Sequence, residues 1–125
     1  MTAPTVAVVE DNADNRLLLR ALLGHLYAIA EYENGAEALE AFALGLPHVV
    51  LLDISLPGMS GVEVLGRIRA DQRLQRLPVI ALTAHAMAGD REEYLAVGFD
   101  DYVSKPIVDE RLLLRAIERC MARGG

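Results

Sequence analysis

The segment 49–53, Val-Val-Leu-Leu-Asp, limits the possible folds of this chain more than any other stretch. Four consecutive apolar residues lead directly into a carboxylate, without the alternation typical of a strand that has one solvated face. A continuous apolar run of this length is typical of a parallel strand buried on both faces. The Pro57-Gly58 pair that follows predicts a loop. Asp53 would then end a central strand, at the edge where open α/β sheets bind ligands.

The rest of the chain alternates between similar short apolar runs and segments of helical periodicity. Because the connections between them are short, this alternation predicts a parallel sheet with helices on both faces. We expect one domain, residues 1–125, without an output domain. Gly24 is a candidate early end of the first helix. The expected strands are 5–9, 27–32, 49–53, 78–82 and 101–103, and the expected helices are 16–26, 36–44, 61–70, 86–97 and 110–121.

Composition excludes several classes of function. The net charge of −6 and the pI near 5.0 argue against a nucleic-acid partner, which requires clustered positive charge. No apolar run approaches the ~20 residues of a membrane span, and no signal peptide opens the chain. Cys120 is the only cysteine, so an internal disulfide is impossible. We therefore expect a cytoplasmic protein with no nucleic-acid or membrane partner.

Acidic residues stand at the ends of two expected strands. Glu10 and Asp11 follow the first strand directly, and Asp53 ends the third. Capping of a helix by Asn12 or Asp14 explains some of the polar residues after the first strand, but not Glu10 and Asp11 side by side. Carboxylates gathered at one sheet edge repel one another unless a cation joins them. Mg²⁺ suits such a set of oxygen ligands.

Two further polar residues belong to the same edge. Thr83 follows the fourth expected strand, and Lys105 follows the fifth and is the only lysine beside eleven arginines. If the site met a phosphoryl donor, Asp53 could act as the nucleophile. Mg²⁺ and Lys105 would offset charge on the phosphoryl oxygens, and the Thr83 hydroxyl would bond to one of them.

The chain resembles response regulator receiver domains, the family of the bacterial chemotaxis regulator. The segment 82–91 is similar to that of stand-alone cell-division regulators and of the receivers of hybrid histidine kinases. The resemblance implies a flavodoxin-like fold, a five-stranded parallel sheet in the order 2-1-3-4-5 with helices on both faces. It is carried by Glu10-Asp11-Asn12, Leu51-Leu52-Asp53, Pro57-Gly58-Met59-Ser60-Gly61, Leu82-Thr83-Ala84 and Tyr102-Val103-Ser104-Lys105-Pro106.

The resemblance also implies a phosphorylation site with a metal beside it. Asp53 would be the phosphoacceptor, and the cofactor would be Mg²⁺, with Mn²⁺ as a substitute. Asp11 and Asp53 would bind the metal directly, Glu10 mostly through water, and Ser55 through its backbone carbonyl.

The remaining implied residues would read out the phosphorylation. Thr83 and Tyr102 would be the switch pair, and Lys105 would contact the phosphoryl group. A histidine kinase or a histidine phosphotransfer protein would be the donor, and a downstream protein would bind the face formed by the last two helices and the strand between them. The protein would be a signalling switch rather than an enzyme, although it would promote its own phosphorylation and dephosphorylation.

Three alternatives remain open at this point. The chain could be a receiver excised from a hybrid kinase. A small aspartyl-phosphate phosphatase would have a second aspartate two residues after the nucleophile, where this chain has Ser55. A flavin or nucleotide binder of the same fold would need a Gly- or Ser/Thr-rich loop after the first strand, where the acidic pair Glu10-Asp11 would repel phosphate.

Overall fold

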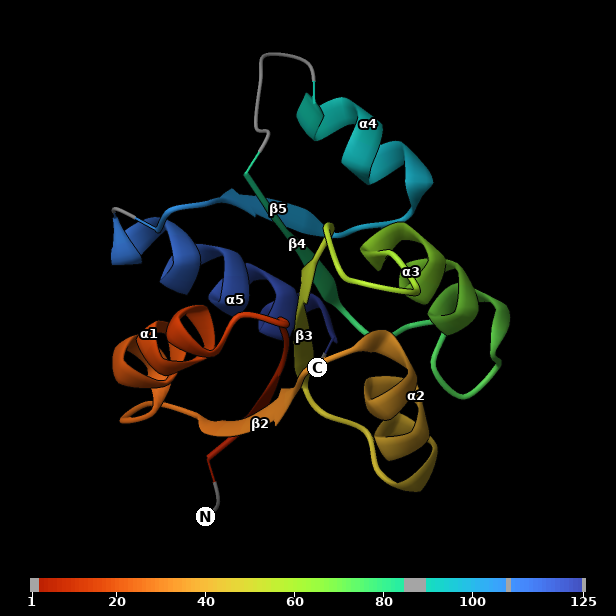
Figure 1. The fold of residues 1–125 in the computed structure, drawn as a ribbon, viewed down its shortest axis with the longest axis horizontal. Helices are drawn as coiled ribbons and strands as arrows, with labels where there is room; N and C mark the ends of the chain where they lie inside the picture. Colours follow the sequence, from red (N-terminus) through yellow and green to blue (C-terminus); the bar gives the residue numbers. More distant parts are fainter. Residues whose placement is uncertain (1–2, 85–89, 108, 125) are drawn as a thin grey trace.

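A computed structural model describes residues 3–84, 90–107 and 109–124. Strands and helices alternate along these residues, as the sequence predicts (Figure 1). The elements are β1 (Thr5–Val9), α1 (Ala13–Leu23), β2 (Ala28–Tyr32), α2 (Gly35–Leu44), β3 (Val49–Asp53), α3 (Gly61–Ala70), β4 (Val79–Thr83), α4 (Asp90–Val97), β5 (Asp101–Ser104) and α5 (Glu110–Gly124).

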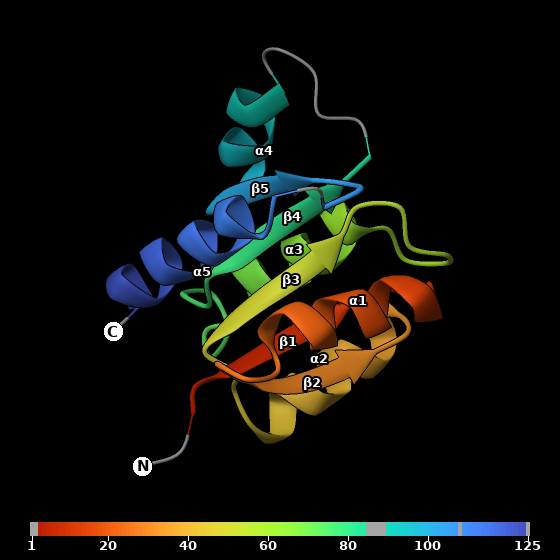
Figure 2. The ribbon, with the colours of Figure 1, turned by 90° about the vertical axis from the view of Figure 1, so that its left-hand side faces the viewer.

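The five strands form one parallel sheet in the order β2-β1-β3-β4-β5, which confirms the expected fold class (Figure 2). All five residues of β3 are buried, as its continuous apolar run predicts. In the register of the sheet Asp53 pairs with Leu82, and Thr83 pairs with Ser104. The carboxyl ends of β3, β4 and β5 are therefore aligned at one edge.

Each face of the sheet carries its own hydrophobic core. Helices α1 and α5 cover one face, and α2 and α3 cover the other (Figure 1). Because side chains alternate along a strand, Val6 and Val8 of β1 pack on the α1/α5 side, whereas Ala7 and Val9 pack on the α2/α3 side. The residues of β3 and β4 divide in the same way. The apolar residues of these strands thus stabilise both layers at once.

Several helix boundaries differ from those expected. Helix α1 spans Ala13–Leu23 rather than 16–26, because the Asn12 side chain accepts a hydrogen bond from the backbone N–H of Asn15 at 3.0 Å and caps the helix. The helix ends just before Gly24. Helix α4 is described from Asp90, so the start expected at residue 86 lies outside the described residues. None of the described helices combines the length and the apolar character that a membrane span requires.

The segment between β3 and α3 brings the start of the helix against the end of the strand. Ser60 caps α3, with its hydroxyl oxygen 3.2 Å from the backbone nitrogen of Glu63. Gly58 has a φ of 74°, in the left-handed region that favours glycine. A Cβ on Gly61 would lie 2.3 Å from the carbonyl oxygen of Asp53, so only glycine allows this close approach.

Candidate functional site

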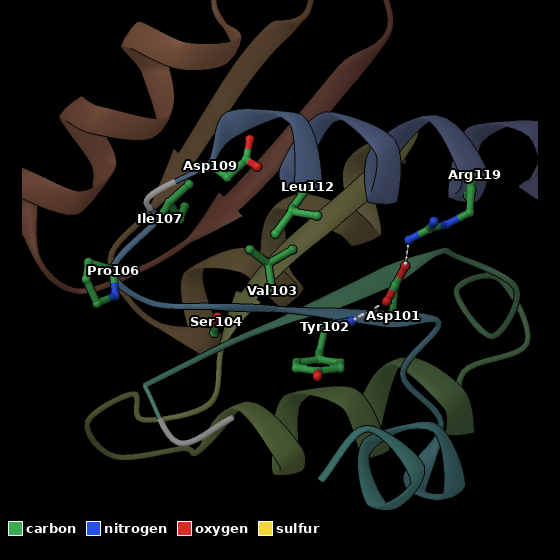
Figure 3. A pocket seen from close by; sticks show the side chains of 9 residues that line it. All are labelled: Asp101, Tyr102, Val103, Ser104, Pro106, Ile107, Asp109, Leu112 and Arg119. Carbon is green, nitrogen blue, oxygen red and sulfur yellow. Dashed lines mark hydrogen bonds and ion pairs between the residues drawn. The ribbon is translucent and has the colours of Figure 1, made fainter. Parts of the chain in front are cut away.

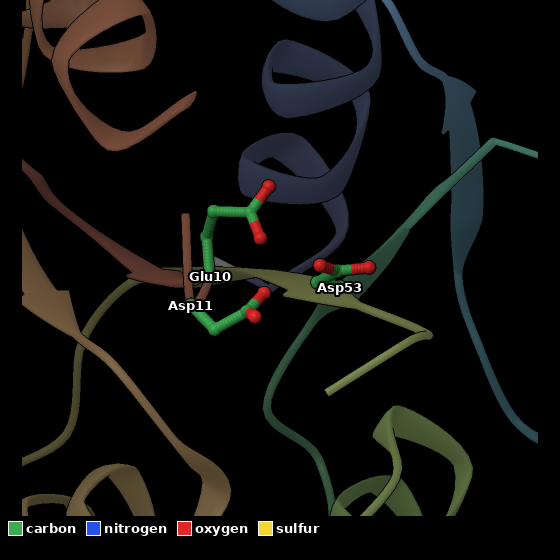
Figure 4. Close-up of side chains that lie close together, drawn as sticks. All are labelled: Glu10, Asp11 and Asp53. Carbon is green, nitrogen blue, oxygen red and sulfur yellow. The ribbon is translucent and has the colours of Figure 1, made fainter. Parts of the chain in front are cut away.

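The structure brings together the three acidic residues that the sequence places at strand ends. One carboxylate oxygen from each of Glu10, Asp11 and Asp53 lies within 4.8 Å of the others. Figure 4 shows the three side chains close together, with Glu10 and Asp11 from the segment that follows β1 and Asp53 from the end of β3. Glu10 is fully buried and Asp53 is 2% exposed, whereas Asp11 is exposed. The cluster is therefore open to solvent on the Asp11 side.

Glu10 is held on one oxygen and unpaired on the other. Its Oε1 accepts hydrogen bonds from Asn15 Nδ2 at 2.8 Å and from Lys105 Nζ at 3.1 Å. Its Oε2 is buried and has no hydrogen-bond partner among the described residues. Burial, together with the neighbouring Asp53 carboxyl, raises the pKa of Glu10 from 4.5 to about 7. A cation or a proton bound at Oε2 would give this buried oxygen the partner that it lacks among the described residues.

Asp53 is held by a different set of donors. Its Oδ1 accepts a hydrogen bond from the backbone N–H of Ser55 at 3.0 Å, and its Oδ2 lies 3.1 Å from Lys105 Nζ. Burial raises the pKa of Asp53, but the close approach of the Glu10 carboxyl, the Ser55 N–H and the Lys105 ammonium together outweigh burial and leave the pKa below its usual value. Of the two neighbouring carboxyls, Glu10 therefore binds a proton more readily, and Asp53 is favoured in the ionised form that a nucleophile requires.

Lys105 is fixed at both ends. Its backbone N–H donates to the carbonyl oxygen of Thr83 at 2.7 Å, which extends the pairing of β4 with β5 by one step. Burial lowers the pKa of the Lys105 ammonium, but its hydrogen bonds to Glu10 and Asp53 outweigh burial and raise the pKa overall. The ammonium therefore stays charged.

These residues fit a divalent cation. Three carboxylates provide hard oxygen ligands of the kind that Mg²⁺ prefers. The unpaired Oε2 of Glu10 is a second, independent sign, since a buried carboxylate oxygen without a partner is costly. The backbone N–H of Ser55 faces Asp53, whereas a role of its carbonyl as a metal ligand stays a prediction.

The two expected switch residues, Thr83 and Tyr102, lie on β4 and β5 beside helix α4. Thr83 ends β4 and is 2% exposed, and its hydroxyl oxygen lies 3.0 Å from the hydroxyl oxygen of Tyr94 on α4. Tyr102 of β5 is half-buried, and its ring lies 5.8 Å from that of Tyr94 at an angle of 39°. Tyr94 therefore contacts both residues of the expected switch pair.

The outer edge of the sheet is hollowed where β5 meets α5. A cavity of about 220 Å³ opens there, between Val103 and Ser104 of β5 and Leu112 of α5. Figure 3 shows Tyr102 pointing to the opposite face of β5 from Val103 and Leu112. At one end of the cavity Arg119 forms an ion pair with Asp101 at 2.6 Å.

Sequence reasoning missed two residues that hold this site. Asn15 lies five positions after Glu10, in the first turn of α1, so an earlier start for that helix would have brought it close to Glu10. Tyr94 gave no such signal, because the apolar face of α4 is weak and its position against β4 and β5 depends on tertiary packing.

The sequence matches a known protein family and known relatives. The sequence profile of the response regulator receiver domain matches residues 6–118. The polar-differentiation response regulator DivK of Brucella anthropi is 41% identical over 110 residues, which cover 87% of this chain and 89% of that protein. The signal transduction histidine-protein kinase BarA of Escherichia coli K12 is 42% identical over 112 residues, which cover 88% of this chain but 12% of the kinase.

A solved structure gives the same result. The receiver domain of a sensor histidine kinase from Pseudomonas aeruginosa PAO1 superposes with a TM-score of 0.86 and 33% sequence identity, over 97% of this chain and 99% of that one. The profile match spans nearly the whole sheet and most of its helices. This chain belongs to the response regulator receiver domain family.

Proposed function

We propose that residues 1–125 act as one phosphorylation-controlled switch in a two-component or phosphorelay pathway, with Asp53 as the phosphoacceptor. The observation that carries this proposal is the placement of an ionised, nearly buried Asp53 carboxylate 3.1 Å from the Lys105 ammonium and beside two further carboxylates. Relatives that are stand-alone regulators and relatives that are kinases both support a place in such a pathway.

The donor would be a phosphohistidine of a histidine kinase or of a phosphotransfer protein. A carboxylate oxygen of Asp53 attacks phosphorus, the P–N bond to the donor imidazole breaks, and the imidazole leaves with a proton from solvent. The nucleophile needs no general base, because the low pKa of Asp53 keeps it ionised. Lys105 holds one Asp53 oxygen and offsets the charge of the incoming phosphoryl oxygens.

Glu10, Asp11, Asp53 and the Ser55 carbonyl would hold Mg²⁺, which supplies charge neutralisation during phosphoryl transfer. The solved receiver domain from Pseudomonas aeruginosa is described with a magnesium ion coordinated in its active site cleft, which supports this choice. Hydrolysis of the aspartyl phosphate at the same site, in which water attacks phosphorus, the bond to the Asp53 oxygen breaks and inorganic phosphate leaves, would make the domain a self-resetting switch rather than a conventional enzyme.

The output would be a protein contact. Phosphorylation would draw Thr83 toward the phosphoryl group and Tyr102 inward, and so change the face formed by α4, β5 and α5. The cavity between β5 and α5 and the exposed apolar side chains of Leu95, Val97 and Leu112 support this face as the docking site of a downstream protein.

The proposal is tested with acetyl phosphate as a small donor. Wild type with Mg²⁺ should gain the mass of one phosphoryl group, and Mn²⁺ should be tried in its place. Asp53→Asn should gain none, whereas Asp14→Asn, at an exposed aspartate of α1, should behave as wild type. Equal incorporation in wild type and Asp53→Asn would overturn the proposal. Release of phosphate from phosphate esters by the wild type would favour the phosphatase alternative.

A further inference from the structure

Helix α4 bonds directly to a residue of the expected switch pair. The hydroxyl oxygens of Thr83 and Tyr94 lie 3.0 Å apart, and Thr83 is almost fully buried. A hydrogen bond to a buried hydroxyl favours the side-chain position that makes it, so this bond helps to hold the Thr83 hydroxyl toward α4. The sequence motifs that identify the family do not include Tyr94.

The ring of Tyr94 is held so that its hydroxyl stays at Thr83. It packs edge-on against Phe99, with ring centroids 6.0 Å apart and an interplanar angle of 88°. It also lies against Tyr102, with centroids 5.8 Å apart. The rings of Tyr94 and Tyr102 both join the hydrophobic core on the α2/α3 side of the sheet. Tyr94 is thus packed between the two expected switch residues.

The sheet separates Thr83 from Asp53. Along β4, Val79 and Ala81 face the α2/α3 side, and Thr83 has the same parity. Along β3, Val49 and Leu51 face the α1/α5 side, and Asp53 shares their parity. To bond to a phosphoryl oxygen on Asp53, the Thr83 hydroxyl must therefore turn across the end of the sheet and away from Tyr94.

We propose that Tyr94 is a positioning residue that holds the Thr83 hydroxyl toward α4 in the unphosphorylated protein. Phosphorylation of Asp53 then proceeds at the expense of the Thr83–Tyr94 hydrogen bond, and its loss releases α4. This inference rests on the proposed function, because it assigns a resting-state partner to the switch threonine. Tyr94 opposes the activated state, whereas Lys105 favours it.

The variant Tyr94→Phe tests the inference, because it removes the hydroxyl and keeps the ring against Phe99 and Tyr102. Beryllofluoride with Mg²⁺ is the probe, as a stable mimic of the phosphoryl group. Loss of one neutral hydrogen bond from the resting state should tighten beryllofluoride binding roughly fivefold, and should raise the rate constant of phosphorylation by acetyl phosphate by a similar factor. Tyr32→Phe, at the opposite edge of the sheet, is the matched control and should bind as wild type.

A second measurement needs no ligand. In spectra of the methyl groups of threonine, the Thr83 signal of free Tyr94→Phe should move from the wild-type resting position toward the beryllofluoride-bound position. A purely structural role for Tyr94 would not move the signal along that line. An unchanged Thr83 signal with unchanged or weaker beryllofluoride binding would overturn the inference.

The inference and the proposed function fail in different ways. If wild type binds beryllofluoride and Asp53→Asn does not, the proposed function stands, and the result for Tyr94→Phe decides this inference alone. If wild type binds no beryllofluoride, the proposed function fails and the inference fails with it.

Discussion

The ammonium of Lys105 lies 3.1 Å from Oδ2 of Asp53 and 3.1 Å from Oε1 of Glu10, a residue 95 positions earlier in the chain. One cation thus joins the ends of three strands. Its compact shape matters, because a guanidinium would present a wide planar fork where two carboxylates converge. The only lysine of a chain with eleven arginines makes this contact.

Replacing this ammonium should impair phosphorylation. In Lys105→Arg the charge remains but cannot occupy the same point between Glu10 and Asp53. We expect the rate constant with acetyl phosphate to fall by about 100-fold, as for loss of a group that stabilises transition-state charge. Arg67→Lys, the opposite exchange at an exposed position of α3, should leave the rate unchanged. A rate constant for Lys105→Arg within about twofold of the wild-type value, rather than the ~100-fold loss expected of such a group, would contradict the role of Lys105.

Stability without metal should depend on pH through Glu10. The pKa of Glu10 is about 7 in the folded protein against an ordinary value of 4.5, so between these values the folded state binds a proton that the unfolded state releases. The stabilisation is complete below pH 4.5 and is lost as the pH rises through 7. The pKa of Asp53 is shifted downward, so Asp53 affects stability only at still lower pH.

Urea denaturation in EDTA, repeated across this pH range, measures the effect. The free energy of unfolding of wild type should fall as the pH rises, and Mg²⁺ should reduce the fall because a cation favours ionised Glu10. The Glu10→Gln variant should show a smaller slope in EDTA. Equal slopes in wild type and Glu10→Gln would contradict the assignment to Glu10.

Two glycines of helix α3 should respond oppositely to alanine. A Cβ at position 61 would lie 2.3 Å from Asp53 O and 2.8 Å from Ile54 Cα, so Gly61→Ala must push the helix away from the phosphoacceptor strand. We expect a loss of about 2 kcal/mol of stability and slower phosphorylation. Gly66 has open space around it, so Gly66→Ala should stabilise the protein by about 0.5–1 kcal/mol. Chemical denaturation of both variants checks the contrast, which equal effects would contradict.

Arg69 of α3 should contribute strongly to the stability of the protein, because it binds the segment that follows the C-terminal end of α4. Its guanidinium donates to the carbonyl oxygens of Leu77 at 2.6 Å and Gly98 at 2.8 Å, and to the Asp100 carboxylate at 2.9 Å. A lysine cannot make this set of bonds. Arg69→Lys should therefore lower the free energy of unfolding by about 2 kcal/mol. Arg67→Lys, two residues earlier and exposed, is the control, and an equal loss there would contradict the role of Arg69.

Much of the fold could be predicted because its signals are local. The apolar run of β3 indicates a doubly buried strand wherever it lies in the sheet, and parallel strands align their carboxyl ends whatever their neighbours are. Glu10, Asp53 and Lys105 were therefore expected at one edge, and the structure brings them there.

Details that depend on packing were not predictable in the same way. The start of α1 depends on the choice between Asn12 and Asp14 as its cap, and the side-chain bond of Asn12 decides it. The bond between Thr83 and Tyr94 depends on how α4 lies against β4 and β5, and the weak apolar pattern of α4 does not specify this. The raised pKa of Glu10 follows from its burial beside Asp53, and this burial depends on the three-dimensional packing of the strand ends.

The identity of the phosphorylated side chain tests the central claim most directly. Wild type is treated with acetyl phosphate and Mg²⁺, the acyl phosphate is reduced with borohydride, and the peptides are analysed by mass spectrometry. Reduction should convert Asp53, and no other carboxylate, to homoserine. Reduction of Asp11 to homoserine, or of Glu10 to 2-amino-5-hydroxypentanoic acid, with Asp53 unchanged, would contradict it.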